Sequence, residues 1–272
     1  YTLLDRNVNL TPGTYAGSYY KLLLYHSVSH SYLMFELKIM RLTMSYKAIL
    51  IDKNPDYSVS STTLLDEHLS EGDVQLDIIA STINYKDALA ITNQSPIIRH
   101  FPLVPGIDLV GKVTSSATDR FKIGDTVLLN GFGVGETHSG GFAEKASLKS
   151  DWLIHLPTSL SPIDAMTIGT AGYTAMLSLI ALEKHGVTPS SGKILVTGAT
   201  GGVGSFAVSL LAKLGYYVIA STGKEHEHAY LYELGAKEII DRAELLEINK
   251  PLQKTRWVAA IESVGGQTLM NV

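Results

Sequence analysis

The sequence contains no cysteine in 272 residues. This absence excludes disulfide frameworks, thiolate zinc sites, iron–sulfur clusters and cysteine nucleophiles. An excess of positive charge is also lacking, because 22 Lys and Arg face 26 Asp and Glu. Such a balance gives no electrostatic footprint for nucleic acid. No apolar run approaches the roughly 18 residues that a membrane span needs. We therefore expect a soluble, cytoplasmic protein that contacts neither nucleic acid nor a membrane.

The first 43 residues differ from the rest of the chain in composition and in hydrophobic pattern. They hold six of the fourteen tyrosines and show no steady period of 2 or 3.6. They also lack the charged start, apolar middle and cleavage site of a secretory signal, whereas a small excess of Lys and Arg leaves a mitochondrial-type leader open. We interpret residues 1–43 as an extension outside the fold. Because the pattern before Val272 is that of the start of a helix, we expect a fragment.

From Met44 to about Pro157, short β-type runs alternate with turn residues. This spacing predicts a partly open β-barrel. The expected strands are 46–51, 73–80, 108–113, 126–129 and 142–147.

Beyond Pro157 the period lengthens to that of helices alternating with strands, which predicts a parallel, doubly wound sheet. Ser161 is expected to cap a helix that has Pro162 in its first position. Further expected elements are strands 193–197, 216–221, 238–240 and 257–263 and helices 203–214 and 225–234. We place one domain at 44–165 and a second, incomplete one at 166–272.

A glycine-rich turn, Thr197-Gly198-Ala199-Thr200-Gly201-Gly202-Val203-Gly204, joins the first strand of that domain to an amphipathic helix. Gly201 allows a pyrophosphate to approach the backbone, Gly204 lets the helix pack on the strand, and free N–H groups at the helix start attract the anion. In this context the turn predicts a dinucleotide site rather than a turn that binds nothing. The expected contacts are Gly201, Gly202, Val203, Gly204 and Ser205.

The end of the second strand indicates which dinucleotide is bound. A unit that prefers NAD places Asp or Glu about 20 residues beyond the glycines. Here Thr222, Gly223 and Lys224 follow Ser221, which suits a 2′-phosphate and therefore NADPH. Alternatively, Lys224 only begins an exposed helix. Arg242 either adds a second charge at the adenosine end or is a solvated surface residue.

Several further motifs give the chain a family resemblance. With its β-rich first domain and GATGGVG turn, it resembles the zinc-free, quinone-oxidoreductase-like branch of the medium-chain dehydrogenase/reductase superfamily, and within it the acrylyl-CoA reductase family. The resemblance covers about 44–272 and is carried by the segments 84–92, 101–108, 131–136 and 168–177. It implies a GroES-like barrel domain followed by a Rossmann domain that is truncated at the C-terminus, since the family's sheet has two more strands before the chain returns to the barrel.

The resemblance also implies chemistry without a metal. Zinc members of the superfamily have Cys near the position of Asn84 and a Gly-His-Glu motif at 105–108, and both ligands are absent here. One departure from related sequences is Glu262-Ser263, where Asp-Thr is more usual.

Reduction of an activated C=C bond needs a hydride donor, a group that steadies negative charge on the carbonyl, and a proton for the α-carbon. The resemblance places Asn84, Tyr85 and Asp87 at the substrate site. Asn84 and Tyr85 can donate hydrogen bonds to an enolate-like oxygen, and Tyr85 can contact the nicotinamide or donate a proton. Alternatively, Tyr85 is a half-buried packing residue and Asp87 caps the following helix.

Thr174 matches the family position near the nicotinamide amide; alternatively, its hydroxyl bonds only the helix backbone.

The predicted function is NADPH-dependent reduction of a short α,β-unsaturated thioester such as acryloyl-CoA. A quinone or enone reductase of the same fold and a catalytically silent NADPH-binding protein are the alternatives, and a homodimer is left open. Candidates for the CoA phosphates are Lys86, Arg99 and His100.

Overall fold

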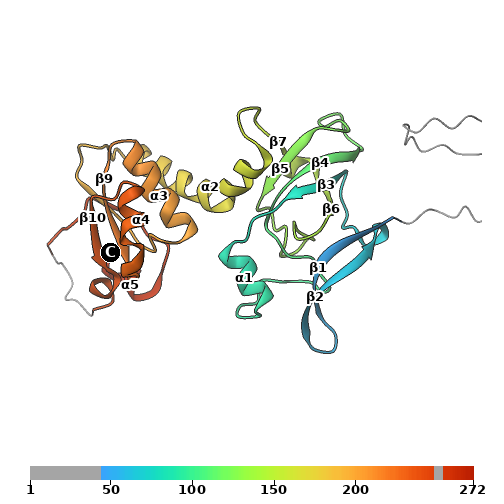
Figure 1. The fold of residues 1–272 in the computed structure, drawn as a ribbon, viewed down its shortest axis with the longest axis horizontal. Coiled ribbons are helices and arrows are strands. Elements are labelled where there is room, and N and C mark those ends of the chain that lie inside the picture. Colours follow the sequence, from blue (N-terminus) through green and yellow to red (C-terminus); the bar gives the residue numbers. More distant parts are fainter. Residues whose placement is uncertain (1–43, 248–253) are drawn as a thin grey trace, which may run out of the picture. The chain divides into compact units, whose positions relative to one another are not determined.

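The computed structural model describes residues 44–247 and 254–272 of the chain. The expectations for residues 1–43 fall outside these described residues. The first part is β-rich, as expected, and its elements are shown in blue to green in Figure 1. They are β1 (Ser45–Lys53), β2 (Tyr57–Leu65), β3 (Val74–Ala80), α1 (Tyr85–Ile91), β4 (Asp108–Ser116), β5 (Thr126–Asn130), β6 (Lys145–Leu148) and β7 (Ile154–His155).

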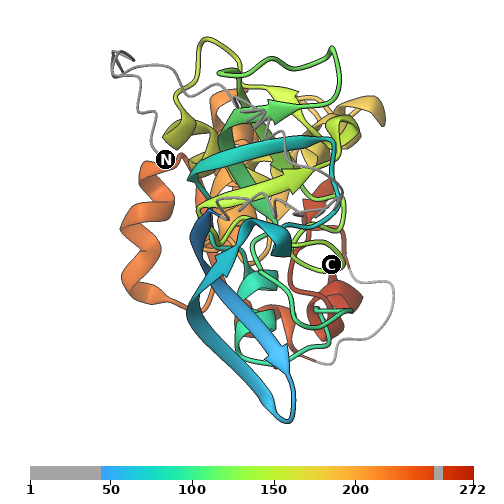
Figure 2. The same ribbon diagram turned by 90° about the vertical axis from the view of Figure 1, so that its right-hand side faces the viewer.

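Strands β3 to β7 form one antiparallel sheet in the order β6-β3-β4-β5-β7. Strand β3 shows the alternation that such a sheet requires, because Val74 and Leu76 are buried while Gln75 and Asp77 are exposed. Most buried side chains of this sheet share one apolar core, whereas Val110 and Leu128 belong to a second cluster. Strands β1 and β2 pair separately as the long hairpin seen in Figure 2.

The helix α2 (Pro162–Lys184) starts where the sequence predicts. The Ser161 hydroxyl accepts a hydrogen bond from the Asp164 N–H at 3.1 Å, and the Asp164 carboxylate accepts one from the Ser161 N–H at 3.1 Å. This reciprocal pair satisfies two N–H groups that the first turn leaves free. At Gly169 the helix is kinked, with φ 47° and ψ −160°.

The kink divides the packing of α2. Before it, Ala165 and Met166 pack with residues of β4 and β5. After it, Ala175 and Leu179 belong to the core of the second sheet. The domain boundary that we expected between residues 165 and 166 therefore falls inside a single kinked helix.

The length of α2 corrects one expectation. With 23 residues, it is by length and composition long and apolar enough to cross a membrane, although we expected no such stretch. Its buried residues pack on both sides of the kink against other elements of the fold. This packing accounts for the buried part of α2, whereas Tyr173, Met176 and Leu177 are exposed, and a single such helix is weak evidence for a membrane.

The second part contains a four-stranded parallel sheet in the order β10-β9-β8-β11, as expected for a doubly wound domain. The chain runs from β8 to one side through β9 and β10 and then to the other side with β11. Ligands bind such sheets at the carboxyl ends of the strands, where the order reverses. The elements are β8 (Lys193–Val196), α3 (Gly202–Lys213), β9 (Tyr217–Thr222), the short η3 (Glu225–Glu227), α4 (His228–Glu233), β10 (Glu238–Asp241), η4 (Arg242–Leu245), β11 (Ala259–Ile261) and α5 (Gly266–Asn271).

Candidate functional site

The glycine turn lies between β8 and α3, at the carboxyl end of a central strand. A Cβ atom on Gly204 would lie 2.2 Å from the Gly198 carbonyl oxygen, so only glycine permits this close packing. Gly201 is the N-cap of α3 and, like Gly202, is exposed. The first N–H groups of a helix have no partner within it. The turn therefore presents open backbone donors at the place where a pyrophosphate would bind.

The other two predicted contacts in this turn differ in their surroundings. Val203 is partly buried and packs against the core of the parallel sheet. The Ser205 hydroxyl donates to the Ala199 carbonyl at 3.3 Å, and the Ser205 N–H donates to the Gly201 carbonyl at 2.8 Å. Ser205 thus stabilises the turn itself, and its hydroxyl is already engaged.

The residues predicted to choose the cofactor come together at the ends of β9 and β10. Thr222 is buried, and its hydroxyl accepts a hydrogen bond from the Lys224 N–H at 3.1 Å. A Cβ atom on Gly223 would lie 2.8 Å from Arg242 Nε, so the Arg242 side chain lies directly over Gly223. Asp241, the partner of Thr222 in the neighbouring strand, accepts from the Ala243 N–H at 2.8 Å. Lys224 and Arg242 are exposed, and both cations stand beside the same strand end.

Three predicted residues of the substrate site lie at the start of α1. Asn84 is its N-cap and Tyr85 its first residue. The Tyr85 side chain is 80% exposed, which excludes the half-buried packing role in this structure. A phenol here is open to a ligand.

Asp87, in contrast, is only 1% exposed. Its carboxylate accepts from the Asn84 N–H at 2.8 Å and from the Ile107 N–H at 3.1 Å. Burial raises the pKa of Asp87, although these hydrogen bonds act in the opposite direction. The contacts are those of the capping alternative: Asp87 fixes the start of α1 against the segment before β4.

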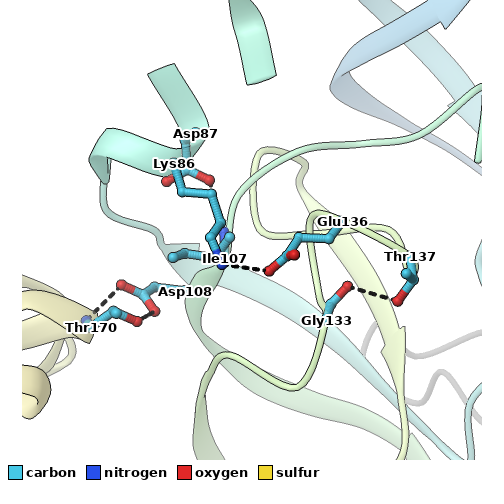
Figure 3. Close-up of polar contacts among 8 residues, drawn as sticks. All are labelled: Lys86, Asp87, Ile107, Asp108, Gly133, Glu136, Thr137 and Thr170. Carbon is cyan, nitrogen blue, oxygen red and sulfur yellow. Dashed lines mark hydrogen bonds and ion pairs between the residues drawn. The ribbon is translucent and has the colours of Figure 1, made fainter. Parts of the chain in front are cut away.

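Sequence reasoning assigned no role to Asp108, the first residue of β4, yet it is the most connected polar group of this region. It is 0% exposed, and its carboxylate accepts hydrogen bonds from Asn84 Nδ2 at 2.9 Å and Asn130 Nδ2 at 2.8 Å. The Thr170 N–H also donates to it, at 2.8 Å, as does the Thr170 hydroxyl. Figure 3 shows Thr170 of α2 facing Asp108. The available indication was a single acid inside the apolar run 103–110.

The candidates for CoA phosphates lie near α1 but are not equivalent. Lys86 forms an ion pair with Glu136 at 2.9 Å, which Figure 3 also shows. Arg99 and His100 are exposed, and the Arg99 N–H donates to the Glu136 carbonyl at 2.9 Å. Glu136 therefore holds Lys86 and the Arg99 backbone near each other.

Thr174 lies on an exposed face of α2, one turn after Thr170. Its carbonyl accepts from the Ser178 hydroxyl at 3.0 Å. The Thr174 side chain is accordingly open on the helix surface, and a contact with the nicotinamide stays a prediction.

The unusual Glu262 is fully engaged at the end of β11. Its carboxylate accepts from the Thr197 hydroxyl at 3.1 Å and from the N–H groups of Val264, at 2.7 Å, and Gly265, at 3.0 Å. Glu262 thus ties the start of the glycine turn to the loop after β11. Within residues 44–247 and 254–272, no group of three or more His, Asp or Glu residues could hold a metal ion.

Comparison with known proteins gives matches over both parts of the chain. Residues 70–158 match the alcohol dehydrogenase GroES-like domain. The chain is 51% identical over 227 residues to a probable acrylyl-CoA reductase, AcuI, of Escherichia coli, covering 83% of this chain and 70% of that protein. It is 43% identical to acrylyl-CoA reductase AcuI of Ruegeria pomeroyi, with coverage of 84% and 70%.

Two solved structures are also similar. The yhdH oxidoreductase of Salmonella enterica, in complex with NADP, superposes with a TM-score of 0.79 at 51% identity and covers 83% of this chain and 69% of that one. Bacillus subtilis yhfP, with NAD bound, gives a TM-score of 0.79 at 44% identity, with coverage of 84% and 70%. Both similarities extend over most of the described residues.

Proposed function

Because the chain belongs to the acrylyl-CoA reductase family, in the quinone-oxidoreductase-like branch of the medium-chain dehydrogenases/reductases, we propose that it reduces the C=C bond of a short α,β-unsaturated thioester such as acryloyl-CoA with NADPH. The observation that carries the proposal is the 51% identity to a probable acrylyl-CoA reductase over 83% of the chain. The proposal is also supported by two hydrogen-bond donors at the start of α1, the exposed Tyr85 and the partly buried Asn84.

The residues present fit NADPH. The open start of α3 suits the pyrophosphate, and Gly201, Gly202 and Gly204 leave room for it. Lys224 and Arg242 provide the positive charge that a 2′-phosphate requires. One similar structure contains NADP and another contains NAD, so the cations at the end of β9 are the feature on which the preference of this chain rests.

NADPH supplies a hydride for the β-carbon of the substrate. The protein must then steady the negative charge that develops on the thioester oxygen and deliver a proton to the α-carbon. We assign the first task to the Asn84 amide and the Tyr85 hydroxyl, both hydrogen-bond donors. Tyr85, with its 80% exposed side chain, is also placed to meet the nicotinamide and to donate the proton.

Asp87 has a different role in this proposal. Both of its oxygens are occupied by backbone N–H groups, and the side chain is buried. A carboxyl group held in this way keeps α1 in place and does not reach the substrate. We therefore assign Asp87 to positioning of Asn84 and Tyr85.

The experiment that tests the function is an acceptor panel. NADPH oxidation is followed with acryloyl-CoA, a quinone and a simple enone at matched concentrations. The proposal predicts the highest kcat/KM with acryloyl-CoA. A preference for the quinone or enone would favour the alternative reductase, and NADPH binding without turnover of any acceptor would indicate a silent binding protein.

We also propose a cytoplasmic location and leave the homodimer as a question for sedimentation analysis. The sequence has no cysteine and so no disulfide. This is compatible with a reducing compartment but does not require one. A mass from equilibrium sedimentation that equals twice the chain mass would support the dimer.

A further inference from the structure

The Asp108 carboxylate joins three elements that carry the proposed chemistry. One oxygen accepts from Asn84 Nδ2 and from the Thr170 N–H, and the other accepts from Asn130 Nδ2 and from the Thr170 hydroxyl. These donors come from the N-cap of α1, the end of β5 and the kink of α2. Asp108 itself is 0% exposed. It is therefore a buried carboxylate whose four hydrogen bonds all come from uncharged groups.

An ionised carboxylate accepts all four of these hydrogen bonds without any rearrangement. An ionised carboxylate is acceptor-only, whereas an amide of the same shape presents one acceptor oxygen and two N–H donors. With Asn at position 108, its NH2 group would face the Asn130 amide and the Thr170 hydroxyl, and both of these partners would have to turn from donating to accepting. Because buried polar groups that lose their partners are costly, the neighbours would have to move.

The kink of α2 brings Thr170 to Asp108. A Cβ atom on Gly169 would lie 3.0 Å from Asp108 Oδ2, and its φ of 47° favours glycine. The backbone at Gly169 therefore approaches the carboxylate closely, and the following N–H points at it. Thr174, the predicted nicotinamide contact, stands one helical turn farther on.

Asp108 also fixes the orientation of the Asn84 amide. Since the carboxylate accepts only, Asn84 must turn its nitrogen toward Asp108. One N–H of that nitrogen is then used, and the second N–H and the amide oxygen are held in defined directions. A donor with a fixed direction is what stabilisation of a developing oxyanion requires.

We propose that Asp108 is a positioning residue of the reductase. Through Asn84 it orients the donor for the substrate oxygen, and through Thr170 it holds the turn of α2 that faces the cofactor. Asp108 thereby fixes the positions of these two groups relative to each other. This inference rests on the proposed function for its catalytic consequence. Its structural part, the fixed Asn84 amide, stands without it. Asp108 touches neither substrate nor cofactor in this arrangement.

The first experiment is a double-mutant cycle on purified protein with Asp108→Asn, Asn84→Ala and the double variant. A misplaced donor lowers kcat by about 10²-fold. We expect Asp108→Asn to lose about this factor while the NADPH Kd stays within about threefold, because the phosphates bind at α3 and β9. If Asp108 acts through Asn84, the double variant falls no further than the worse single variant. Multiplicative losses would overturn the inference.

A matched control separates positioning from stability. Asp73 is also a carboxylate that holds two segments together, because it accepts hydrogen bonds from the Ser150 N–H at 2.6 Å and from the Ser150 hydroxyl at 2.7 Å. Asp73 lies just before β3, where no site residue is predicted. Asp73→Asn is expected to lower the Tm and to leave kcat unchanged. Equal kcat losses in Asp73→Asn and Asp108→Asn would show that both act through stability alone and would reject the proposal.

A second readout does not depend on turnover. With asparagine labelled in its side-chain nitrogen, the NMR signals of the Asn84 and Asn130 amides are assigned by their loss in Asn84→Ala and Asn130→Ala. Asp108→Asn is expected to shift both signals strongly, and Asp73→Asn is expected to shift neither. An unmoved Asn84 signal in Asp108→Asn would overturn the inference.

If Asp108→Asn does not fold, Thr170→Val replaces it, since this change removes one donor and keeps the helix backbone. A kcat and an Asn84 signal unchanged in folded Thr170→Val would then reject the proposal. An absence of turnover in the unaltered protein, together with the expected NMR shifts, would count against the proposed function alone.

Discussion

The Arg242 side chain lies against Gly223, so that a Cβ atom at position 223 would come within 2.8 Å of Arg242 Nε and 3.0 Å of Cδ. The two residues directly follow the neighbouring parallel strands β9 and β10. Glycine at this position leaves room for the Arg242 side chain. The close approach thus places Arg242 beside Gly223, next in sequence to Lys224, in the region that we propose for the adenosine ribose.

The positive charges of Lys224 and Arg242 are predicted to strengthen the binding of NADPH. Loss of a charged phosphate contact costs about 1.5–3 kcal/mol. We therefore expect Lys224→Ala and Arg242→Ala each to raise the Kd of NADPH by about 10- to 150-fold. Fluorescence titration with NADPH measures this change.

Titration of the same variants with NADH supplies the control, because NADH lacks the 2′-phosphate and its Kd should barely change. Lys237→Ala is a matched control: this exposed lysine precedes β10, at the opposite end of the strand from Arg242. Equal or tighter binding of NADH than NADPH by the unaltered protein would reject the preference.

The exposed Tyr85 is predicted to act on turnover more than on stability. Tyr85→Phe removes the hydroxyl and keeps the ring. If the hydroxyl donates the proton, kcat should fall by about 10²-fold. Tyr85→Ala should in addition weaken NADPH binding, because the ring is lost from the cofactor site. Stopped-flow rates and cofactor titrations of both variants test this, and no change in either quantity would remove Tyr85 from the site.

Activity is predicted to be independent of metal. The Cys and Gly-His-Glu ligands of zinc relatives are absent from the sequence, and Asp108 at the end of the corresponding segment already has four hydrogen-bond donors. Prolonged dialysis against a chelator should leave kcat unchanged. Stoichiometric zinc in elemental analysis, lost together with activity, would contradict the prediction.

The glycine turn yields a prediction about stability. Alanine in a helix is favoured over glycine by about 1 kcal/mol. In Gly204→Ala the new Cβ would lie 2.2 Å from a backbone oxygen, so overpacking of about 1–3 kcal/mol or more should outweigh this gain. In Gly202→Ala the nearest atom is the Ala171 Cβ at 3.0 Å, and the two effects should nearly cancel. Thermal unfolding without cofactor distinguishes the variants; a Gly204→Ala protein as stable as the parent would show that the turn is looser than described.

Acid stability depends in part on Asp73. The Ser150 hydroxyl, which donates to it, holds the pKa of Asp73 below its ordinary value of 3.8. A group whose pKa is lowered by folding stabilises the native state above the unfolded pKa, and this contribution is lost as the pH falls through the folded pKa. Asp73→Asn should therefore be less stable than the parent at pH 7 and lose less stability between about pH 5 and pH 3. Urea unfolding across this range tests the slope; parallel curves would contradict it.

The sequence predicted elements best where one periodicity dominates. The buried strands β3, β4, β8 and β9 and the capped start of α2 lie where the patterns indicate. The strand β2 was missed because its residues, YSVSSTTLL, are mostly exposed, none is fully buried, and the polar run 60–63 interrupts the alternation that starts at Tyr57. The strand β6 begins at Lys145, three residues later than predicted, because the apolar Phe142 and Ala143 lie in the preceding loop, where they pack against β1.

The candidate site was predicted unevenly for a physical reason. The glycine turn and the cations at β9 are local in sequence, so their chemistry is visible in a short segment. The partners of Asp108 come from positions 84, 130 and 170, and no local pattern connects such distant residues. The choice between catalysis and capping for Asp87 likewise needed the Ile107 N–H, which only the fold brings to it.

The central claim, reduction of an unsaturated thioester by NADPH, is tested most directly by following the transferred hydrogen. NADPH deuterated at the nicotinamide C4 is mixed with acryloyl-CoA and the protein, and the product is analysed by mass spectrometry and NMR, with a parallel reaction in heavy water. We predict propanoyl-CoA with deuterium from the cofactor at the β-carbon and deuterium from solvent at the α-carbon. Two results would contradict the proposed function. One is absence of the saturated thioester. The other is a β-carbon that carries no deuterium from the cofactor, whichever of the two C4 hydrogens of NADPH is labelled.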